Sequence, residues 1–124
     1  VRSRLRRVSR EPKYLYLTTT GRVSGRPRRI EIWFTRHEGR YYLVAEHGLR
    51  ARWVQNLLAD PTVRVRVGAR SMRGRARLVD RRTEAPLVGE VRRRSEAKYG
   101  WGDGLVVEIE PAPRASTRRR ARRA

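Results

Sequence analysis

Thr62-Val63-Arg64-Val65-Arg66-Val67 alternates β-branched and charged residues, and Gly68-Ala69-Arg70 follows it directly. Alternation with a period of two is typical of a strand that buries one of its faces. The glycine in the connection favours a turn. Residues 71–79 then run back as the partner strand, so this stretch predicts a β-hairpin and, with it, an antiparallel sheet.

Four further segments have strand character: Tyr14–Thr20, Arg28–Thr35, Tyr41–Ala45 and Leu105–Ile109. In the second of these, apolar residues alternate with polar ones, which places Trp33 on an otherwise polar face. A connection with two glycines and a proline spans residues 21–27, and a hairpin turn is expected over residues 37–40. Pro111 is expected to end the last strand.

Two helices are expected between these strands. The first runs from Arg50 to Leu58 and is stopped by Asp60-Pro61. The second follows an N-cap at Thr83, carries Pro86 in its first turn and continues to about Lys98. The predicted fold is mainly β (α+β), a barrel of about six antiparallel strands with two helices over its openings, because closure removes exposed sheet edges.

Charge divides the chain into three parts. The 124 residues include 32 Lys and Arg and 12 Asp and Glu, a net charge of +20. Residues 1–10 and 114–124 are rich in arginine and contain no acid, so they are expected to be disordered basic arms. Residues 11–113 hold every acid and are expected to form one domain.

Several classes of function are excluded by composition. The chain has no cysteine, and its only histidines, His37 and His47, lack the spacing of a metal site. No serine lies in a nucleophile elbow, and no phosphate-binding loop of the P-loop type is present. We expect neither a membrane span nor a secretory signal, and therefore a cytoplasmic protein.

The basic connection over residues 21–29 is the first candidate site. Five of its side chains suit an anionic group: Arg22, Ser24, Arg26, Arg28 and Arg29. Arginine forks grip oxygen atoms in pairs, and Gly21 and Gly25 are expected to leave backbone amides free for the same purpose. The alternative is that these arginines are solvated turn residues of an arginine-rich chain.

Several segments together resemble the deazaflavin-dependent nitroreductase family. The resemblance rests on Leu17-Thr-Thr-Thr-Gly-Arg-Val-Ser-Gly-Arg-Pro-Arg, on Ile32-Trp-Phe, and on Arg52-Trp-Val-Gln-Asn-Leu-Leu-Ala-Asp-Pro. It covers about residues 14–111. Members of this family are split β-barrel oxidoreductases that use coenzyme F420, a deazaflavin carrying a phosphate and a polyglutamate tail.

The resemblance also implies site residues. Arg22, Ser24 and Arg28 would hold the phosphate and tail, with Arg26 and Arg29 as additions. The residues expected beside the deazaflavin ring are Glu31, Trp33, Ala45, Glu46, His47, Gly48, Trp53 and Asn56. No catalytic side chain is obligatory, because the coenzyme carries the hydride. His47, Tyr99 and Trp101 are expected on the substrate side.

The implied function is hydride transfer from reduced coenzyme F420 to an electron-poor molecule such as a quinone, a nitro compound or an enone. A homodimer is expected from the resemblance. Two alternatives remain open. One is a split barrel that binds FMN or carries a cofactor without turnover. The other is a small basic nucleic-acid-binding barrel, with non-specific binding through the terminal arms.

Overall fold

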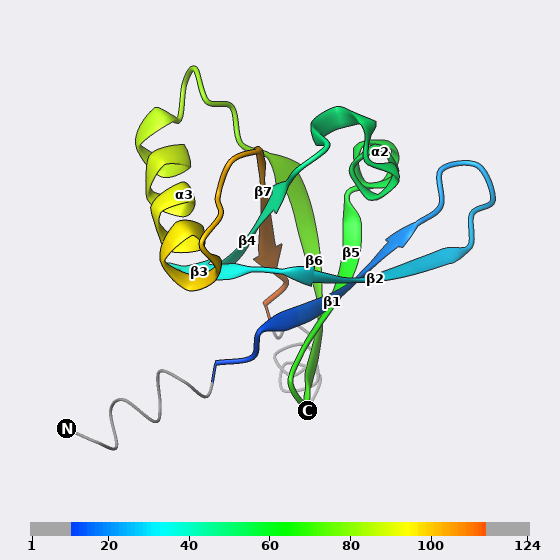
Figure 1. Cartoon of the computed structure of the whole chain (residues 1–124). Coiled ribbons are helices and arrows are strands. Elements are labelled where there is room, and N and C mark those ends of the chain that lie inside the picture. The colour runs from blue at the N-terminus through cyan, green and yellow to red at the C-terminus, as the bar shows by residue number, and fades with distance from the viewer. Residues whose placement is uncertain (1–10, 114–124) are drawn as a thin grey trace.

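The computed structural model describes residues 11–113 as a curled antiparallel sheet of seven strands with two α-helices and one 3₁₀ turn (Figure 1). The strands are β1 (Tyr14–Thr20), β2 (Pro27–Trp33), β3 (Thr35–His37), β4 (Arg40–Ala45), β5 (Thr62–Val67), β6 (Arg70–Leu78) and β7 (Leu105–Pro111). The helical elements are η1 (Gly48–Arg50), α2 (Arg52–Ala59) and α3 (Ala85–Tyr99). The predicted mainly β class is confirmed, and the two basic arms lie outside the described residues.

The strands are arranged in the order β2-β1-β5-β6-β7-β4-β3, and every neighbouring pair is antiparallel. The hairpin that the sequence predicts is present, with Val65 of β5 opposite Met72 of β6. The two edge strands, β2 and β3, are consecutive in the chain and are joined by Phe34 alone. The sheet is therefore a half-barrel, and its two edge strands, β2 and β3, are joined at Phe34.

The expectation of one continuous strand over 28–35 is wrong, because the strand breaks at Phe34. The Phe34 N–H donates to Tyr99 Oη at 3.0 Å, and the Phe34 carbonyl accepts from Lys98 Nζ at 3.0 Å. Side chains at the end of α3 thus satisfy backbone groups that a neighbouring strand would otherwise pair. This break is why the sheet has seven strands instead of about six.

The core fills the inside of the curled sheet. Alternate residues of the strands point inward, as Leu15 and Leu17 of β1 do, and both are fully buried. Helix α2 contributes Leu57 to this core, whereas α3 contributes Val88 and Val91 to a second apolar cluster. Figure 1 shows α2 and α3 on either side of the end of β4.

The start of α3 differs from expectation. Thr83 is exposed and is not the N-cap; Glu84 occupies that position with a φ of −125° and a ψ of 40°, and no side chain caps the helix. The Glu84 carboxylate instead accepts two hydrogen bonds from Arg77 of β6, at 2.7 and 2.8 Å. Pro86 lies in the first turn, as predicted. No helix among residues 11–113 is long and apolar enough to cross a membrane.

Candidate functional site

Two cavities share Trp53 as a lining residue. The aromatic cavity, of about 520 Å³, is lined by Tyr14, Glu31, Ile32, Trp33, Val44, Ala45, Glu46, His47, Ala51, Trp53 and Trp101. The loop cavity, of about 810 Å³, is lined by Thr19, Gly21, Arg22, Val23, Ser24, Pro27, Arg28, Arg29, Ile30, Arg52, Trp53 and Asn56. Both volumes are in the range of small-molecule and cofactor sites.

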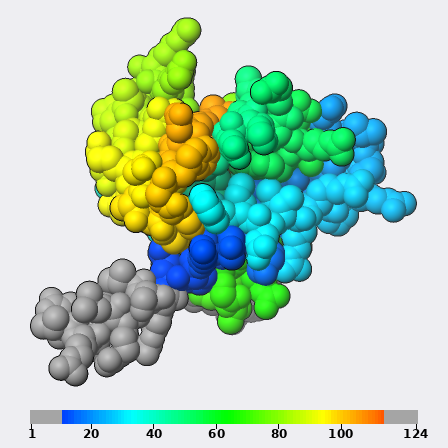
Figure 2. Space-filling model, in the orientation of Figure 1, coloured from blue at the N-terminus to red at the C-terminus, as the bar shows by residue number. Residues whose placement is uncertain are grey.

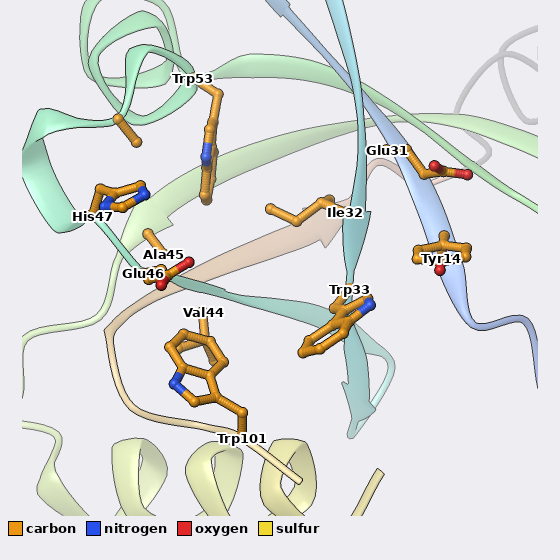
Figure 3. Close-up of a pocket in the computed structure, with 11 residues that line it drawn as sticks. Tyr14, Glu31, Ile32, Trp33, Val44, Ala45, Glu46, His47, Trp53 and Trp101 are labelled. Atoms are coloured by element: carbon orange, nitrogen blue, oxygen red, sulfur yellow. The ribbon is translucent and has the colours of Figure 1, made fainter. Parts of the chain in front are cut away.

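The aromatic cavity is built from three tryptophans on three different elements. Trp53 enters from α2 and Trp101 from the segment after α3, so the two indoles face the cavity from opposite sides (Figure 3). Trp33, at the end of β2, forms the wall nearest the strand junction. Indole walls around an open space suit a planar conjugated ring, which they contact by stacking.

Trp33 is fixed from behind by Tyr99. The two rings are stacked, with centroids 4.4 Å apart and planes 5° from parallel. The Tyr99 hydroxyl accepts from the Phe34 N–H and lies 2.8 Å from the Phe34 carbonyl and 2.7 Å from the Lys13 carbonyl. Tyr99 does not line the cavity, so it supports a wall instead of forming one.

Trp101 lies on a segment that two hydrogen bonds fasten to α3. Ser95 Oγ donates to the Trp101 carbonyl at 2.6 Å, and Arg92 Nη2 donates to the Gly104 carbonyl at 2.9 Å. A Cβ at Gly104 would lie 2.5 Å from the Ala45 carbonyl oxygen, so glycine is needed for close approach there. Figure 2 shows this segment, in orange, directly beside the residues that follow β4.

The loop cavity is shaped by hydrogen bonds within the β1–β2 connection. The Gly21 N–H donates to the Arg26 carbonyl, and the Gly25 N–H donates to the Gly21 carbonyl, each at 2.8 Å. The expectation that these two glycines leave their amides free is therefore wrong. Ser24 Oγ accepts from Arg26 N at 3.1 Å and from Arg28 Nη2 at 3.4 Å, so its own proton can point to a ligand oxygen.

Asn56 fastens this connection to α2. It is only 8% exposed; its Oδ1 accepts from the Arg22 N–H at 3.0 Å, and its Nδ2 donates to Thr19 Oγ1 at 3.1 Å. Beside it, Gln55 Oε1 accepts from Arg22 Nε at 3.1 Å. Asn56 thus positions Arg22 and the loop backbone, while the guanidinium groups of the loop remain exposed around the cavity.

Charged groups at the mouth of the aromatic cavity are few and exposed. Glu31, Glu46 and His47 line it, and all three are largely open to solvent. Glu31 Oε2 accepts a 3.3 Å hydrogen bond from the Tyr16 hydroxyl. Among the described residues, neither Glu46 nor His47 takes part in an ion pair. His47 is the lining residue of this cavity that carries an imidazole.

The structure brings most of the sequence-predicted residues to these two cavities. Only three of them line neither cavity: Arg26, Gly48 and Tyr99. Lining residues that sequence reasoning missed include Tyr14, Ile32, Val44 and Arg52. Apolar strand residues give no sign of a cavity in one sequence, and one further arginine carries no signal in a chain this rich in arginine.

A buried charged cluster lies on other strands. Glu108 of β7 is 6% exposed and accepts from Tyr42 Oη at 2.8 Å and from Arg77 Nε at 2.9 Å. The pKa of Tyr42 is raised well above its usual value, chiefly because the side chain is buried and secondly because it donates a hydrogen bond to Glu108. None of these residues lines either cavity, so the cluster links β4, β6 and β7 outside the candidate site.

Comparison with known structures places the fold in the split-barrel class. A putative pyridoxamine 5′-phosphate oxidase from Listeria innocua superposes with a TM-score of 0.67 at 14% identity, over 90% of this chain and 93% of that chain. A chain described as a domain-swapped dimer gives 0.56 at 23% identity, over 87% and 94%. An F420-H2-dependent reductase, FDR-A, gives 0.57 at 26% identity, over 79% and 94%.

The family follows from the sequence itself. The model of the F420H(2)-dependent quinone reductase family matches residues 3–108. The chain belongs to this family of F420H2-dependent reductases, which confirms the resemblance to deazaflavin-dependent enzymes. No curated protein matches the chain significantly.

Proposed function

We propose that this chain binds reduced coenzyme F420 across both cavities and transfers its hydride to an electron-poor small molecule, with a quinone as the first candidate acceptor. The single observation that carries the proposal is the shared wall at Trp53. Trp53 lines both the aromatic cavity and the arginine-lined loop cavity. A ligand with a flat ring at one end and anionic groups at the other fits this pair of cavities.

The residues of the loop cavity fit the anionic end. Arg22, Arg28 and Arg29 surround it, and the Ser24 hydroxyl has a proton to donate. Guanidinium groups bind phosphate and carboxylate oxygens in bidentate fashion. Asn56 holds the backbone from which Arg22 projects, so the anion site is organised before a ligand arrives.

The residues of the aromatic cavity fit the ring and leave space for a second flat molecule. Trp53 and Trp33 are walls for the coenzyme ring, and Trp101 is a wall for the acceptor. When bound, the reduced coenzyme supplies a hydride. The chain holds the acceptor against the ring, which replaces a bimolecular encounter with a fixed geometry. His47 passes a proton to the acceptor, since reducing a quinone to its hydroquinone requires one hydride and one proton.

The nitro compounds and enones expected from the resemblance share this electron-poor character and are secondary acceptors.

We also propose a homodimer. Its support is the fold's likeness to a chain described as a domain-swapped dimer and the exposure of two large apolar side chains, Leu49 at 58% and Trp33 at 37%. The molar mass of the purified chain by light scattering tests the dimer directly.

The test of the proposed function is a titration of the full chain with coenzyme F420 and, separately, with FMN, followed by tryptophan fluorescence. Saturable binding of the deazaflavin, much weaker binding of FMN, and turnover of a soluble naphthoquinone are expected. Arg28→Ala should weaken coenzyme binding at least tenfold, because it removes a bidentate contact. Arg82→Ala removes the same charge from the β6–α3 connection and is the matched control.

Preferential binding of FMN would contradict the cofactor assignment. Tight binding of the deazaflavin with no reduction of any electron-poor acceptor would make the chain a carrier and would contradict the reductase activity.

A further inference from the structure

The outer surface of four adjacent strands carries a row of arginines. In the register of the sheet, Arg29 of β2 lies opposite Thr18 of β1, Thr18 lies opposite Arg64 of β5, and Arg64 lies opposite Arg73 of β6. In the next row, Arg66 of β5 lies between Tyr16 and Ser71. These seven residues, Tyr16, Thr18, Arg29, Arg64, Arg66, Ser71 and Arg73, are called the arginine face.

The arginine face is hollowed. All seven residues line one depression of about 420 Å³, and Thr18, Arg64 and Arg73 also line a second depression of about 430 Å³ beside it. The short side chains of Thr18 and Ser71 form low points between long arginines. A ligand can therefore lie among the guanidinium groups and contact several of them at once.

Within residues 11–113, no acid neutralises the positive charge of this face. None of its four arginines forms an ion pair with an acid of the described residues. Residues 1–10 and 114–124 contain no Asp or Glu. Arg64 and Arg73 lie directly opposite each other, an arrangement of like charges that destabilises a sheet. A bound polyanion would remove this repulsion.

The face also offers an aromatic surface. The Arg29 guanidinium lies 4.2 Å from the centre of the Tyr16 ring, so an aromatic ring and its stacked cation project together. Flexible single-stranded nucleic acid is bound by this combination, with cations along its phosphates and with flat side chains beneath its bases. Neighbouring strands lie about 4.8 Å apart, so long arginine side chains on different strands of this face can contact successive phosphates.

We propose that the arginine face is a binding surface for single-stranded nucleic acid, without sequence preference. This surface is distinct from the terminal arms and does not depend on the proposed reductase activity. A second copy of the chain does not fit, because it would bring the same charges to the interface. A lipid surface fits poorly, because the large exposed apolar residues of the described part lie elsewhere, at Val23, Leu49 and Leu58 among others.

The experiment measures fluorescence anisotropy of a labelled oligothymidylate with the full chain at several salt concentrations. The test variant combines Arg64→Gln, Arg66→Gln and Arg73→Gln. The matched control combines Arg36→Gln, Arg81→Gln and Arg82→Gln, which removes three charges from exposed positions outside the arginine face. Circular dichroism and denaturant unfolding establish that each variant is folded.

The test variant should lose at least tenfold in affinity at about 100 mM salt, and the slope of log affinity against log salt should become shallower by about 2, or roughly 0.7 per lost phosphate contact. The control should lose less than threefold. Equal losses in both variants would assign binding to overall charge, and an unchanged test variant would assign it to other residues; either outcome overturns the proposal. Binding of vesicles rich in phosphatidylserine, with the same dependence on the three arginines and stronger than that of the oligonucleotide, would overturn it in favour of a membrane.

Discussion

Trp33 and Tyr99 lie 66 residues apart in the chain and stack face to face, with ring centroids 4.4 Å apart and an interplanar angle of 5°. The stack joins the end of β2 to the last residue of α3 and fixes one wall of the aromatic cavity. The Tyr99 hydroxyl at the same time contacts three backbone atoms, of Phe34 and Lys13, at the junction where the half-barrel closes. One side chain thus supports both the fold and the candidate site.

These two roles of Tyr99 can be separated by substitution. Tyr99→Phe keeps the stack and removes the hydroxyl, so stability should fall by about 1 kcal/mol because part-buried hydrogen bonds to Phe34 are lost, while coenzyme affinity changes little. Tyr99→Leu removes the stack as well and should weaken coenzyme binding several-fold. Denaturant unfolding and fluorescence titration measure the two effects. Equal coenzyme affinity in the two variants would mean that the stack does not position Trp33.

Asn56 should behave as a positioning residue for the anion site. Asn56→Ala leaves the Arg22 N–H and Thr19 Oγ1 without their partner, which should cost about 1–3 kcal/mol of unfolding free energy. Coenzyme affinity should fall, because the loop that carries Arg22 is released from α2. The control is Leu58→Ala on the same helix, at a position 53% exposed. A loss of stability with unchanged coenzyme affinity would show that the loop does not need this anchor.

Gly21 should tolerate no side chain. A Cβ there would lie 2.7 Å from Ser24 Oγ and 3.2 Å from the Arg26 carbonyl oxygen. Gly21→Ala should therefore displace the connection and weaken coenzyme binding while the sheet remains folded. Gly89→Ala, in the middle of α3, is the control, and it should be neutral or stabilising by up to about 1 kcal/mol because alanine favours helix. Wild-type coenzyme affinity in Gly21→Ala would contradict the proposed role of the loop.

Stability should depend on pH through the Arg77–Glu84 pair. Hydrogen bonds from Arg77 hold the pKa of Glu84 below its ordinary 4.5. A lowered pKa in the folded state means that the stabilisation is complete above about pH 4.5 and is lost as the pH falls through the folded-state pKa. Glu84→Gln should lower the unfolding midpoint at pH 7, and the difference should disappear in strong acid. Glu96→Gln is the control, and a difference that persists in acid would contradict the ion-pair account.

Much of the fold follows from local patterns in the sequence. The alternation in Thr62–Val67 and the composition of Tyr14–Thr20 predict β5 and β1 at their observed limits. The break at Phe34 is not predictable in this way, because its cause lies in Lys98 and Tyr99, far along the chain. The start of α3 is not predictable from local pattern either, because the Glu84 carboxylate accepts hydrogen bonds from Arg77 on β6 instead of capping the helix.

The candidate site shows the same division. Aromatic and basic residue types indicate which side chains suit a ring and an anion, and most of the expected residues line one of the two cavities. The roles within the site depend on contacts that no single sequence displays. Asn56 fastens the loop, Tyr99 supports Trp33 from behind, and the amides of Gly21 and Gly25 bond within the loop.

The most direct test of the central claim compares the complete coenzyme with its deazaflavin fragment, which lacks the phosphate and tail. Both ligands are titrated into the wild-type chain and into Arg28→Ala, with tryptophan fluorescence as the signal. If the ring occupies the aromatic cavity and the anionic end the loop cavity, Arg28→Ala will bind the complete coenzyme about as weakly as the fragment, while its affinity for the fragment stays unchanged. An equal loss of affinity for both ligands, or for neither, would contradict this division of the coenzyme between the two cavities.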